Sequence, residues 1–196
     1  MFTGIIEASG IITAIRAEQN NIHFHIKSVI STQLKVDQSV SHDGVCLTVT
    51  QIDHDIHQVT AIKETLDRTI LSQWKVGDEI NLERSLTLQT RLDGHFVQGH
   101  CDTSGICIAK EDAGGSWTFR IQFPEEYAAL LIDKGSVCVN GVSLTVVDPS
   151  REDFGVAIIP YTYEHTNFKH LLPGKGVNLE FDILGKYLRR SLELSK

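Results

Sequence analysis

One seven-residue stretch of this chain occurs twice, and the repetition constrains the fold more than any other feature. Gly44-Val-Cys-Leu-Thr-Val-Thr50 and Gly141-Val-Ser-Leu-Thr-Val-Val147 share five of seven residues at an offset of 97 positions. The same offset relates Asn81-Leu-Glu83 to Asn178-Leu-Glu180. A period of this length exceeds that of a solenoid repeat and suits a duplicated small domain. We therefore expect two related halves.

Two further pairs of segments extend the repeat, listed here in matching order: Lys63–Thr69 with Pro160–Thr166 at the offset of 97, and Phe2–Gly10 with Val97–Gly105 at an offset of 95. The polar segment from Ser85 to Gly94 has no counterpart in either copy and predicts a linker. We expect an N-terminal domain at 1–87, a C-terminal domain at 88–184 and a tail at 185–196.

Composition excludes several classes of protein. With 41 % apolar and 22 % charged residues, the chain is typical of soluble globular proteins. A net charge of −7 disfavours a nucleic-acid or anionic-membrane surface, because both need clustered basic residues. The sequence has no Gly-rich phosphate loop, no apolar run that would span a membrane, and no signal-peptide pattern at its N-terminus.

The four cysteines, at positions 46, 101, 107 and 138, form neither a CxxC pair nor a regular framework. This spacing disfavours zinc and predicts reduced thiols in a cytoplasmic protein.

Short alternating segments separated by turns predict an all-β barrel or sandwich. In Ile22-His-Phe-His-Ile26, for example, apolar residues alternate with His23 and His25, which we expect on the solvent face; a metal site there would lack a third ligand. Pro124–Asp133 predicts a helix, since proline and acids suit a first turn. The segment from Leu184 to Leu194 predicts an amphipathic helix that either contacts another subunit or folds back on its own chain.

The repeated motif places Cys46 and Thr48 on one strand face, and Ser143 and Thr145 on the corresponding face of the second copy. Small polar groups beside a glycine suit the close approach of a flat ligand, although a polar exterior face would read the same way. Intervening residues such as Leu47 point towards a core.

The two copies differ where chemistry would matter. Ser143 replaces Cys46, Tyr161 replaces Glu64, and His100 replaces Ile5. Two sites with one frame and different groups would suit two molecules in different roles. A histidine can act as acid or base near neutral pH, or be merely structural. We expect His95 and His100 to point to opposite faces of a strand.

Taken together, five motifs resemble the alpha-chain type of riboflavin synthase, a family of tandem lumazine-binding barrels: Met1–Glu7, Gly44–Val49, Lys63–Thr65, Gly94–His100 and Asn140–Val146. The resemblance covers both halves. It implies two six-stranded antiparallel Greek-key barrels and a C-terminal helix through which three chains form a homotrimer. Two departures are Cys101, where the family usually has an aliphatic residue, and a tail after Leu184 that is short for the family.

The resemblance also implies a transferase reaction that needs no metal or cofactor. Two molecules of 6,7-dimethyl-8-ribityllumazine dismutate by transfer of a four-carbon unit, giving riboflavin and 5-amino-6-(D-ribitylamino)uracil. The active site would form where the N-terminal barrel of one chain meets the C-terminal barrel of another, and association with lumazine synthase is a further implied partner.

By resemblance, the catalytic candidates are His100, Ser143, Thr145 and Cys46, with His100 the first candidate to move the proton of the C7 methyl group. The N-terminal site would use Gly4, Ile5, Ile6, Cys46, Leu47, Thr48, Thr60, Ala61, Ile62, Lys63, Glu64 and Thr65. The C-terminal site would use Gly99, His100, Cys101, Lys134, Ser143, Leu144, Thr145, Ala157, Ile158, Ile159, Pro160, Tyr161 and Thr162.

Two other functions compete with the enzyme. A lumazine- or flavin-carrying antenna protein would share the barrels without catalysis, but it has no need to keep both polar sites. A flavin-binding reductase barrel is disfavoured because no nucleotide domain follows.

Overall fold

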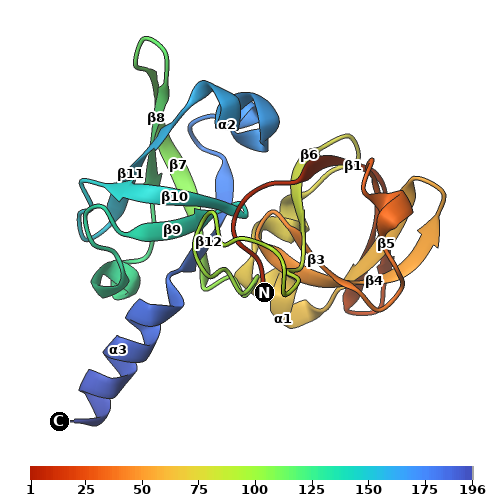
Figure 1. Cartoon of the computed structure of the whole chain (residues 1–196), viewed down its shortest axis with the longest axis horizontal. Helices are drawn as coiled ribbons and strands as arrows, with labels where there is room; N and C mark the ends of the chain where they lie inside the picture. Colours follow the sequence, from red (N-terminus) through yellow and green to blue (C-terminus); the bar gives the residue numbers. More distant parts are fainter. Residues whose placement is uncertain (196) are drawn as a thin grey trace.

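The computed structural model describes residues 1–195, which form two closed six-stranded antiparallel barrels side by side (Figure 1). The strand order is β1-β2-β5-β4-β3-β6 in the first barrel, and the second repeats it with β7 to β12 in the same places. The predicted duplicated all-β architecture is confirmed. A single longer helix, α3, follows the second barrel.

The first barrel contains six strands and three short helices, in chain order β1 (Ala8–Glu18), β2 (Asn21–Lys27), η1 (Ser31–Gln33), β3 (Ser39–His42), β4 (Val45–Asp53), β5 (Ile56–Ala61), α1 (Lys63–Arg68), η2 (Ile70–Gln73) and β6 (Glu79–Arg84). The second contains β7 (Thr103–Asp112), β8 (Trp117–Gln122), η3 (Glu125–Leu130), β9 (Ser136–Val139), β10 (Val142–Val147), β11 (Asp153–Ile158), α2 (Pro160–His165), η4 (Asn167–His170) and β12 (Gly176–Phe181), with α3 at Ile183–Leu194.

Alternation along the motif strands fills the barrel interiors as predicted. Val45, Leu47 and Val49 are buried in the first core, while Cys46 and Thr48 face outwards from it. The second motif strand repeats this pattern.

Local structure differs from two of the expectations. Pro124–Asp133 contains the expected helix, but it is the 3₁₀ helix η3, whose Tyr127, Ala128 and Leu130 pack on the second core. His95 and His100 lie in a loop whose only ladder pairing is an isolated bridge from Phe2 to Val97.

The two barrels meet through reciprocal contacts of equivalent residues. A Cβ atom on Gly44 would lie 2.7 Å from the nitrogen of Gly141, and one on Gly141 would lie 2.8 Å from the nitrogen of Gly44. Both glycines have φ near +80° (80° and 81°), which other residues rarely adopt. Reciprocity of this kind indicates an approximate twofold axis between the halves.

Two buried asparagines link the barrels on either side of this axis. Asn81 accepts from the nitrogen of Asn167 (2.8 Å) and donates to the carbonyl of Asn140 (2.9 Å). Its repeat partner Asn178 accepts from the nitrogen of Ile70 (2.8 Å) and donates to the carbonyl of Asp43 (2.9 Å). Each amide therefore satisfies backbone groups of the other half.

Asp43 occupies the position that Asn140 has in the second half. Burial raises the pKa of Asp43 to about 8, so at neutral pH it is mainly protonated and, like its counterpart, uncharged. The interface thus keeps its symmetry in charge as well as in shape.

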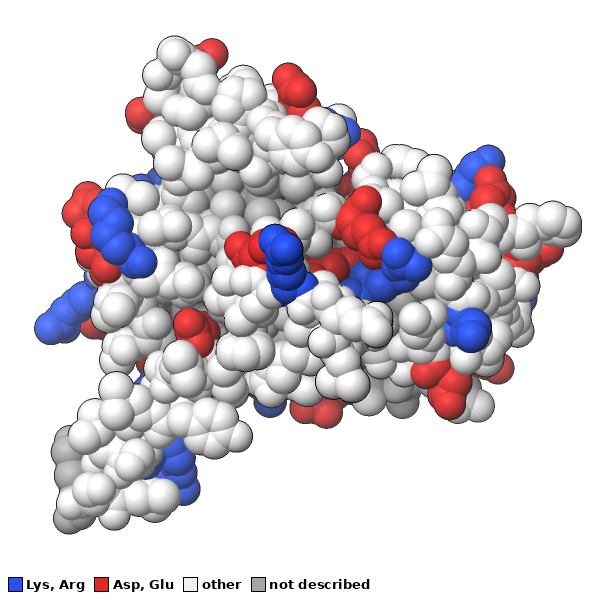
Figure 2. All heavy atoms as spheres, viewed as in Figure 1, with Lys and Arg blue, Asp and Glu red and all other residues white. Residues whose placement is uncertain are grey.

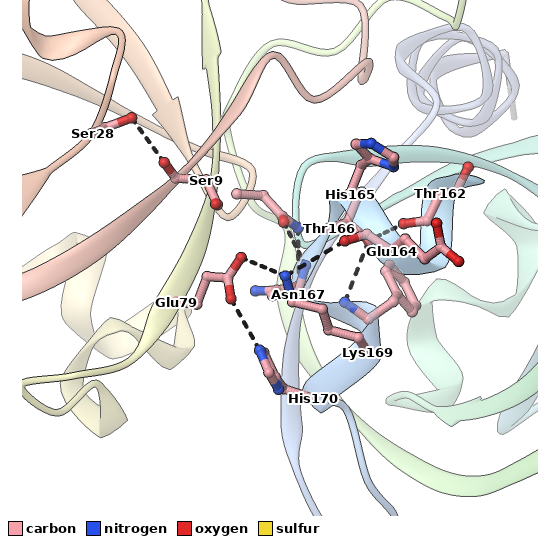
Figure 3. Close-up of polar contacts among 12 residues, drawn as sticks. Ser9, Ser28, Glu79, Thr162, Glu164, His165, Thr166, Asn167, Lys169 and His170 are labelled. Atoms are coloured by element: carbon pink, nitrogen blue, oxygen red, sulfur yellow. Dashed lines mark hydrogen bonds and ion pairs between the residues drawn. The ribbon is translucent and has the colours of Figure 1, made fainter. Parts of the chain in front are cut away.

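One ion-pair cluster breaks that symmetry (Figure 3). Glu79 on β6 accepts from Lys169 at 2.7 Å and lies 3.0 Å from His170, both on η4 of the other barrel. Its repeat position is Gly176, which carries no side chain to pair.

Helix α3 extends away from the barrels (Figure 1), and its visible face is largely uncharged in Figure 2. Its exposed apolar side chains are Leu184, Tyr187, Leu188, Leu192 and Leu194. Within residues 1–195, none of the helices combines the length and apolarity that crossing a membrane requires.

The first barrel contains a buried polar chain that the second lacks. His42 Nε2 lies 2.9 Å from His57 Nε2, His57 Nδ1 lies 2.8 Å from the Ser31 hydroxyl, and His42 Nδ1 lies 3.0 Å from the Val40 carbonyl. The carbonyl can only accept, so one proton order satisfies the chain: Ser31 donates to His57, His57 donates to His42, and His42 donates to the carbonyl. The corresponding residues of the second barrel are Ala128, Val139 and Phe154.

The hydrogen-bonded series Ser31–His57–His42 predicts that the first barrel is the half that loses more stability in acid. Burial lowers the pKa of His57 to about 4, and burial together with the neighbouring His57 holds the pKa of His42 well below its usual value. The unfolded chain takes up protons below pH ~6.5, while the folded barrel does not. The contribution of the two histidines to stability is therefore complete above that pH and is lost as pH drops towards 4, by about 1.4 kcal/mol for each unit of pKa difference. The raised pKa of Asp43 acts in the opposite direction, and it does so equally in the parent and in a variant that lacks only the histidines.

Urea unfolding at pH 7 and pH 5 measures this, because Trp74 reports on the first barrel and Trp117 on the second. Trp117→Phe and Trp74→Phe variants isolate the two signals. The combined change Ser31→Ala, His42→Val and His57→Phe copies the second barrel and should remove the difference. Equal loss of stability in both barrels would contradict the interpretation.

Candidate active site

Two segments far apart in sequence pair at the axis and then cross to opposite barrels. The nitrogen of Phe2 donates to the carbonyl of Val97 at 2.7 Å, and the reverse bond is 3.1 Å long. The chain from Phe2 then runs to the second barrel, where the carbonyl of Gly4 accepts from the nitrogen of Ser143 at 2.7 Å. The chain from Val97 runs to the first barrel in the same way.

There the carbonyl of Gly99 accepts from the nitrogen of Cys46 at 2.8 Å. The approach is so close that a Cβ on Gly99 would lie 2.6 Å from the Cβ of Cys46. Gly4 makes the matching contact with Ser143, also at 2.6 Å, and both glycines have positive φ. Only glycine fits at these crossing points.

The structure therefore places two of the predicted groups, residues 4–6 and 99–101, at the opposite sites from those expected. Gly4, Ile5 and Ile6 lie with the Ser143 strand rather than with Cys46, and Ile6 packs on the second core. Gly99, His100 and Cys101 lie with the Cys46 strand, and Cys101 packs on the first core. Each motif strand is completed by the segment that leads into the other barrel.

A cavity of about 500 Å³ opens beside Cys46. It is lined by five elements: the motif strand, helix α1, the crossing segment with His100, η3 with Tyr127, and helix α3 with Lys186. Lys186 pairs with Asp102 at 2.6 Å, and Arg68 lies 3.6 Å from Glu64. The cavity wall thus carries both charge signs beside a thiol and an imidazole.

The Ser143 site contains a histidine, His95, that was not among the predicted site residues. His95 Nδ1 lies 2.7 Å from the Ser143 hydroxyl, and burial lowers the pKa of His95, which keeps it neutral at pH 7. Its Nε2 atom is buried without a partner among the described residues. A hydroxyl bonded to a neutral imidazole is an arrangement that can relay a proton. The Gly-His pairs at Gly94-His95 and Gly99-His100 were the available signal.

The remaining predicted residues lie at the strand-to-helix corners of the two barrels. Thr60 bonds His23 at 2.8 Å, Ala61 is buried, and Lys63, Glu64 and Thr65 begin α1. In the second barrel Ala157 and Ile158 end β11, and Pro160, Tyr161 and Thr162 begin α2. The corner residues Ile62 and Ile159 are exposed, as is Tyr161.

Lys134 is set apart from these corners. It lies in the turn before β9, where its ammonium group is exposed and 3.8 Å from Asp133. Thr48 and Thr145 project from the outer faces of their strands, whereas Leu144 is half-buried.

Neither short helix was predicted, although both had signals. In α1, Lys63 pairs with Asp67 at 2.6 Å over one helical turn, and in α2 Pro160 occupies the first turn.

Comparison with known proteins places this geometry in a family. The sequence model of the family described as "Lumazine binding domain" matches residues 3–85 and again 98–182. The chain is 38 % identical over 196 residues to the riboflavin synthase of Actinobacillus pleuropneumoniae, covering 98 % of this chain and 90 % of that protein. It is 37 % identical to the riboflavin synthase of Mycobacterium bovis, covering 97 % of each.

The chain belongs to the riboflavin synthase family. Among solved structures, LumP complexed with riboflavin superposes with a TM-score of 0.87 at 21 % identity, over 92 % of this chain and 99 % of LumP. LumP complexed with 6,7-dimethyl-8-(1'-D-ribityl) lumazine gives 0.84 at 22 % identity, over 92 % and 98 %. At 21–22 % identity, this likeness shows that the chain and LumP share a fold.

The cavity makes a prediction about thiol reactivity. All four cysteines are free. Burial raises the pKa of Cys101, Cys107 and Cys138, so each holds its proton more tightly. We expect a thiol reagent to modify Cys46 first in the folded protein. Cys46→Ser should remove the fast phase and Cys107→Ser should leave it; a fast phase that survives Cys46→Ser would contradict the assignment.

Proposed function

We propose that this family member is a riboflavin synthase, a transferase that converts two molecules of 6,7-dimethyl-8-ribityllumazine into riboflavin and 5-amino-6-(D-ribitylamino)uracil. One observation carries the proposal: the same site frame occurs in both barrels, with Cys46 and His100 in one copy and Ser143 and Ile5 in the other. A dismutation needs this arrangement, because two identical molecules must be held alike and treated differently.

The residues supply the chemistry that such a reaction requires. The C7 methyl group of the lumazine is acidic, because its carbanion delocalises into the ring, so a modest base is sufficient. His100 would move this proton, and Ser143 with Thr145 would steady the ring or an added nucleophile. Cys46 is the polar or nucleophilic group at the other site. The four-carbon transfer balances between the two substrates without an oxidant or a metal.

The corners and crossing segments would bind the substrate rings and ribityl chains. The exposed Ile62 and Ile159, at equivalent corners, offer flat apolar contact, and neighbouring backbone groups offer hydrogen bonds to a ring edge. Holding the two rings in register would provide much of the rate, since it replaces an encounter of two molecules by a step within one complex.

The proposal includes the assembly. The exposed apolar side chains of α3 support a homotrimer contact, in which the N-terminal barrel of one chain would face the C-terminal barrel of another. It also includes the division into 1–87, 88–184 and the tail 185–196, and a cytoplasmic location, which free thiols suit. Association with lumazine synthase rests on family resemblance alone.

The direct test is incubation of the purified chain with 6,7-dimethyl-8-ribityllumazine alone, followed by riboflavin absorbance. We expect steady turnover with one riboflavin formed for two substrates consumed. Tight binding without riboflavin would contradict the proposal and indicate an antenna-type carrier.

Two variants test the assigned residues. His100→Ala should lower kcat by about 10²-fold, the usual contribution of a general base, and Ser143→Ala by about tenfold. His100→Ala should keep the unfolding midpoint of the parent, because the His100 side chain is exposed. Ser143→Ala should fold but lose about 1 kcal/mol of stability, because the buried His95 Nδ1 loses its partner. His54→Asn, in the exposed turn between β4 and β5, is the control and should keep full activity. Full activity in both test variants would remove their roles.

A further inference from the structure

Two glutamates at one repeat position hold the crossing segments in place. Glu83 lies near the end of β6 in the first barrel and is 6 % exposed. Glu180 is its equivalent near the end of β12 and is 2 % exposed. Neither pairs with a basic side chain within hydrogen-bond distance among the described residues. Their buried carboxyl groups are used instead to bind backbone.

Glu180 accepts three consecutive backbone N–H groups. Its Oε1 takes the nitrogen of Gln98 at 2.6 Å, and its Oε2 takes those of Gly99 (2.8 Å) and His100 (2.9 Å). The carbonyl of Gly99 is bonded in turn to Cys46. The residue that carries the imidazole is thus fixed between the carboxylate of one barrel and the motif strand of the other.

Glu83 makes the equivalent contacts with the N-terminal segment. It accepts from the nitrogen of Thr3 at 2.7 Å, from the Thr3 hydroxyl at 2.6 Å and from the nitrogen of Gly4 at 2.9 Å. The next two residues, Ile5 and Ile6, lie beside the Ser143 strand, and Ile6 packs on the second core. The apolar wall of that site therefore depends on Glu83.

The charge state of these groups follows from their partners. Burial raises the pKa of both carboxyls, and the N–H and O–H donors act in the opposite direction by stabilising the anion. Every contact is a donor pointing at an oxygen, so the carboxylate form satisfies all of them.

We propose that Glu180 and Glu83 are positioning residues for the reaction, with Glu180 holding the His100 segment beside Cys46 in the cavity and Glu83 holding the apolar segment 4–6 beside Ser143. This inference rests on the proposed function. Because one segment presents a histidine and the other an isoleucine at the same place, the two glutamates affect different kinetic constants. Glu180 acts mainly on the chemical step. Glu83 acts mainly on substrate binding through Ile5 and Ile6, and to a smaller extent on the chemical step, because its partner Thr3 accepts from the nitrogen of His95 at 3.1 Å.

We call the contacts of Glu180 with residues 98–100 and of Glu83 with residues 3–4 the glutamate clamps. Replacing either glutamate by glutamine tests its clamp with little change of side-chain shape. Its amide nitrogen would face a backbone N–H, so at least one contact is lost and the segment shifts. Glu180→Gln should lower kcat by about tenfold to 100-fold with little change in KM, and Glu83→Gln should raise KM more than it lowers kcat. Glu79→Gln is the matched control: it removes the ion pairs with Lys169 and His170 (Figure 3) without touching either segment, and should keep both constants.

A double-mutant cycle separates positioning from a merely structural role. If Glu180 acts through His100, Glu180→Gln should change kcat little in the His100→Ala background but should multiply with Ser143→Ala. A full additional loss in the His100→Ala background, or wild-type kcat in Glu180→Gln, would overturn the inference.

Hydrogen exchange in the unmodified protein covers the case in which the variants fail to fold. The amides of Gln98, Gly99 and His100 should exchange slowly although they lie in a loop, and unprotected exchange would overturn the clamp.

Glu180→Asp keeps the charge but shortens the side chain, and its kcat should lie between those of the parent and Glu180→Gln. A parent chain that forms no riboflavin would instead refute the proposed function, leaving the exchange result to judge the clamp.

Discussion

The contact between Gly44 and Gly141 is the constraint on which the rest of this structure depends. Two backbones with positive φ meet there more closely than any side chain would permit, and Asn81 and Asn178 satisfy the polar groups around them. Because the glycines belong to the repeated motif, the same contact that joins the barrels also fixes where the two motif strands begin. The sites that follow each glycine are thereby set at related positions about one axis.

The crossing segments make each site depend on both barrels, and the residues that differ between the two copies make the two sites chemically different. Each site combines a strand from one barrel with a segment leading into the other, so neither barrel holds a complete set of groups by itself. Differences between the copies then act at matched places: Cys46 against Ser143, and His100 against Ile5. The backbone frame and its glutamate clamps are the same in both halves, while the chemistry differs. A reaction between two identical substrates needs that combination.

Much of this organisation was predictable from the sequence, because duplication preserves what both halves share. The repeat, the inward Val and Leu of the motif and the outward Cys46 and Thr48 follow from offset and alternation. The crossing did not follow, because local sequence does not record which barrel a loop reaches. His95 was missed for a related reason: its bond to Ser143 joins residues 48 positions apart. The clamps were visible as the repeated Asn-Leu-Glu, but their role needed the backbone donors that only the fold assembles.

The number of ligands bound by each chain tests the central claim, that the two barrels provide two sites with one frame. An 8-ribityllumazine without methyl groups at positions 6 and 7 is a suitable probe, since it has no C7 methyl proton to lose and cannot react. Calorimetric titration should give two molecules bound per chain. Replacing the crossing glycine of the weaker site by valine, which is Gly4 for the Ser143 site or Gly99 for the Cys46 site, should abolish binding at that site. One molecule per chain, with the second barrel empty at saturation, would contradict the account and leave a single-site binding protein.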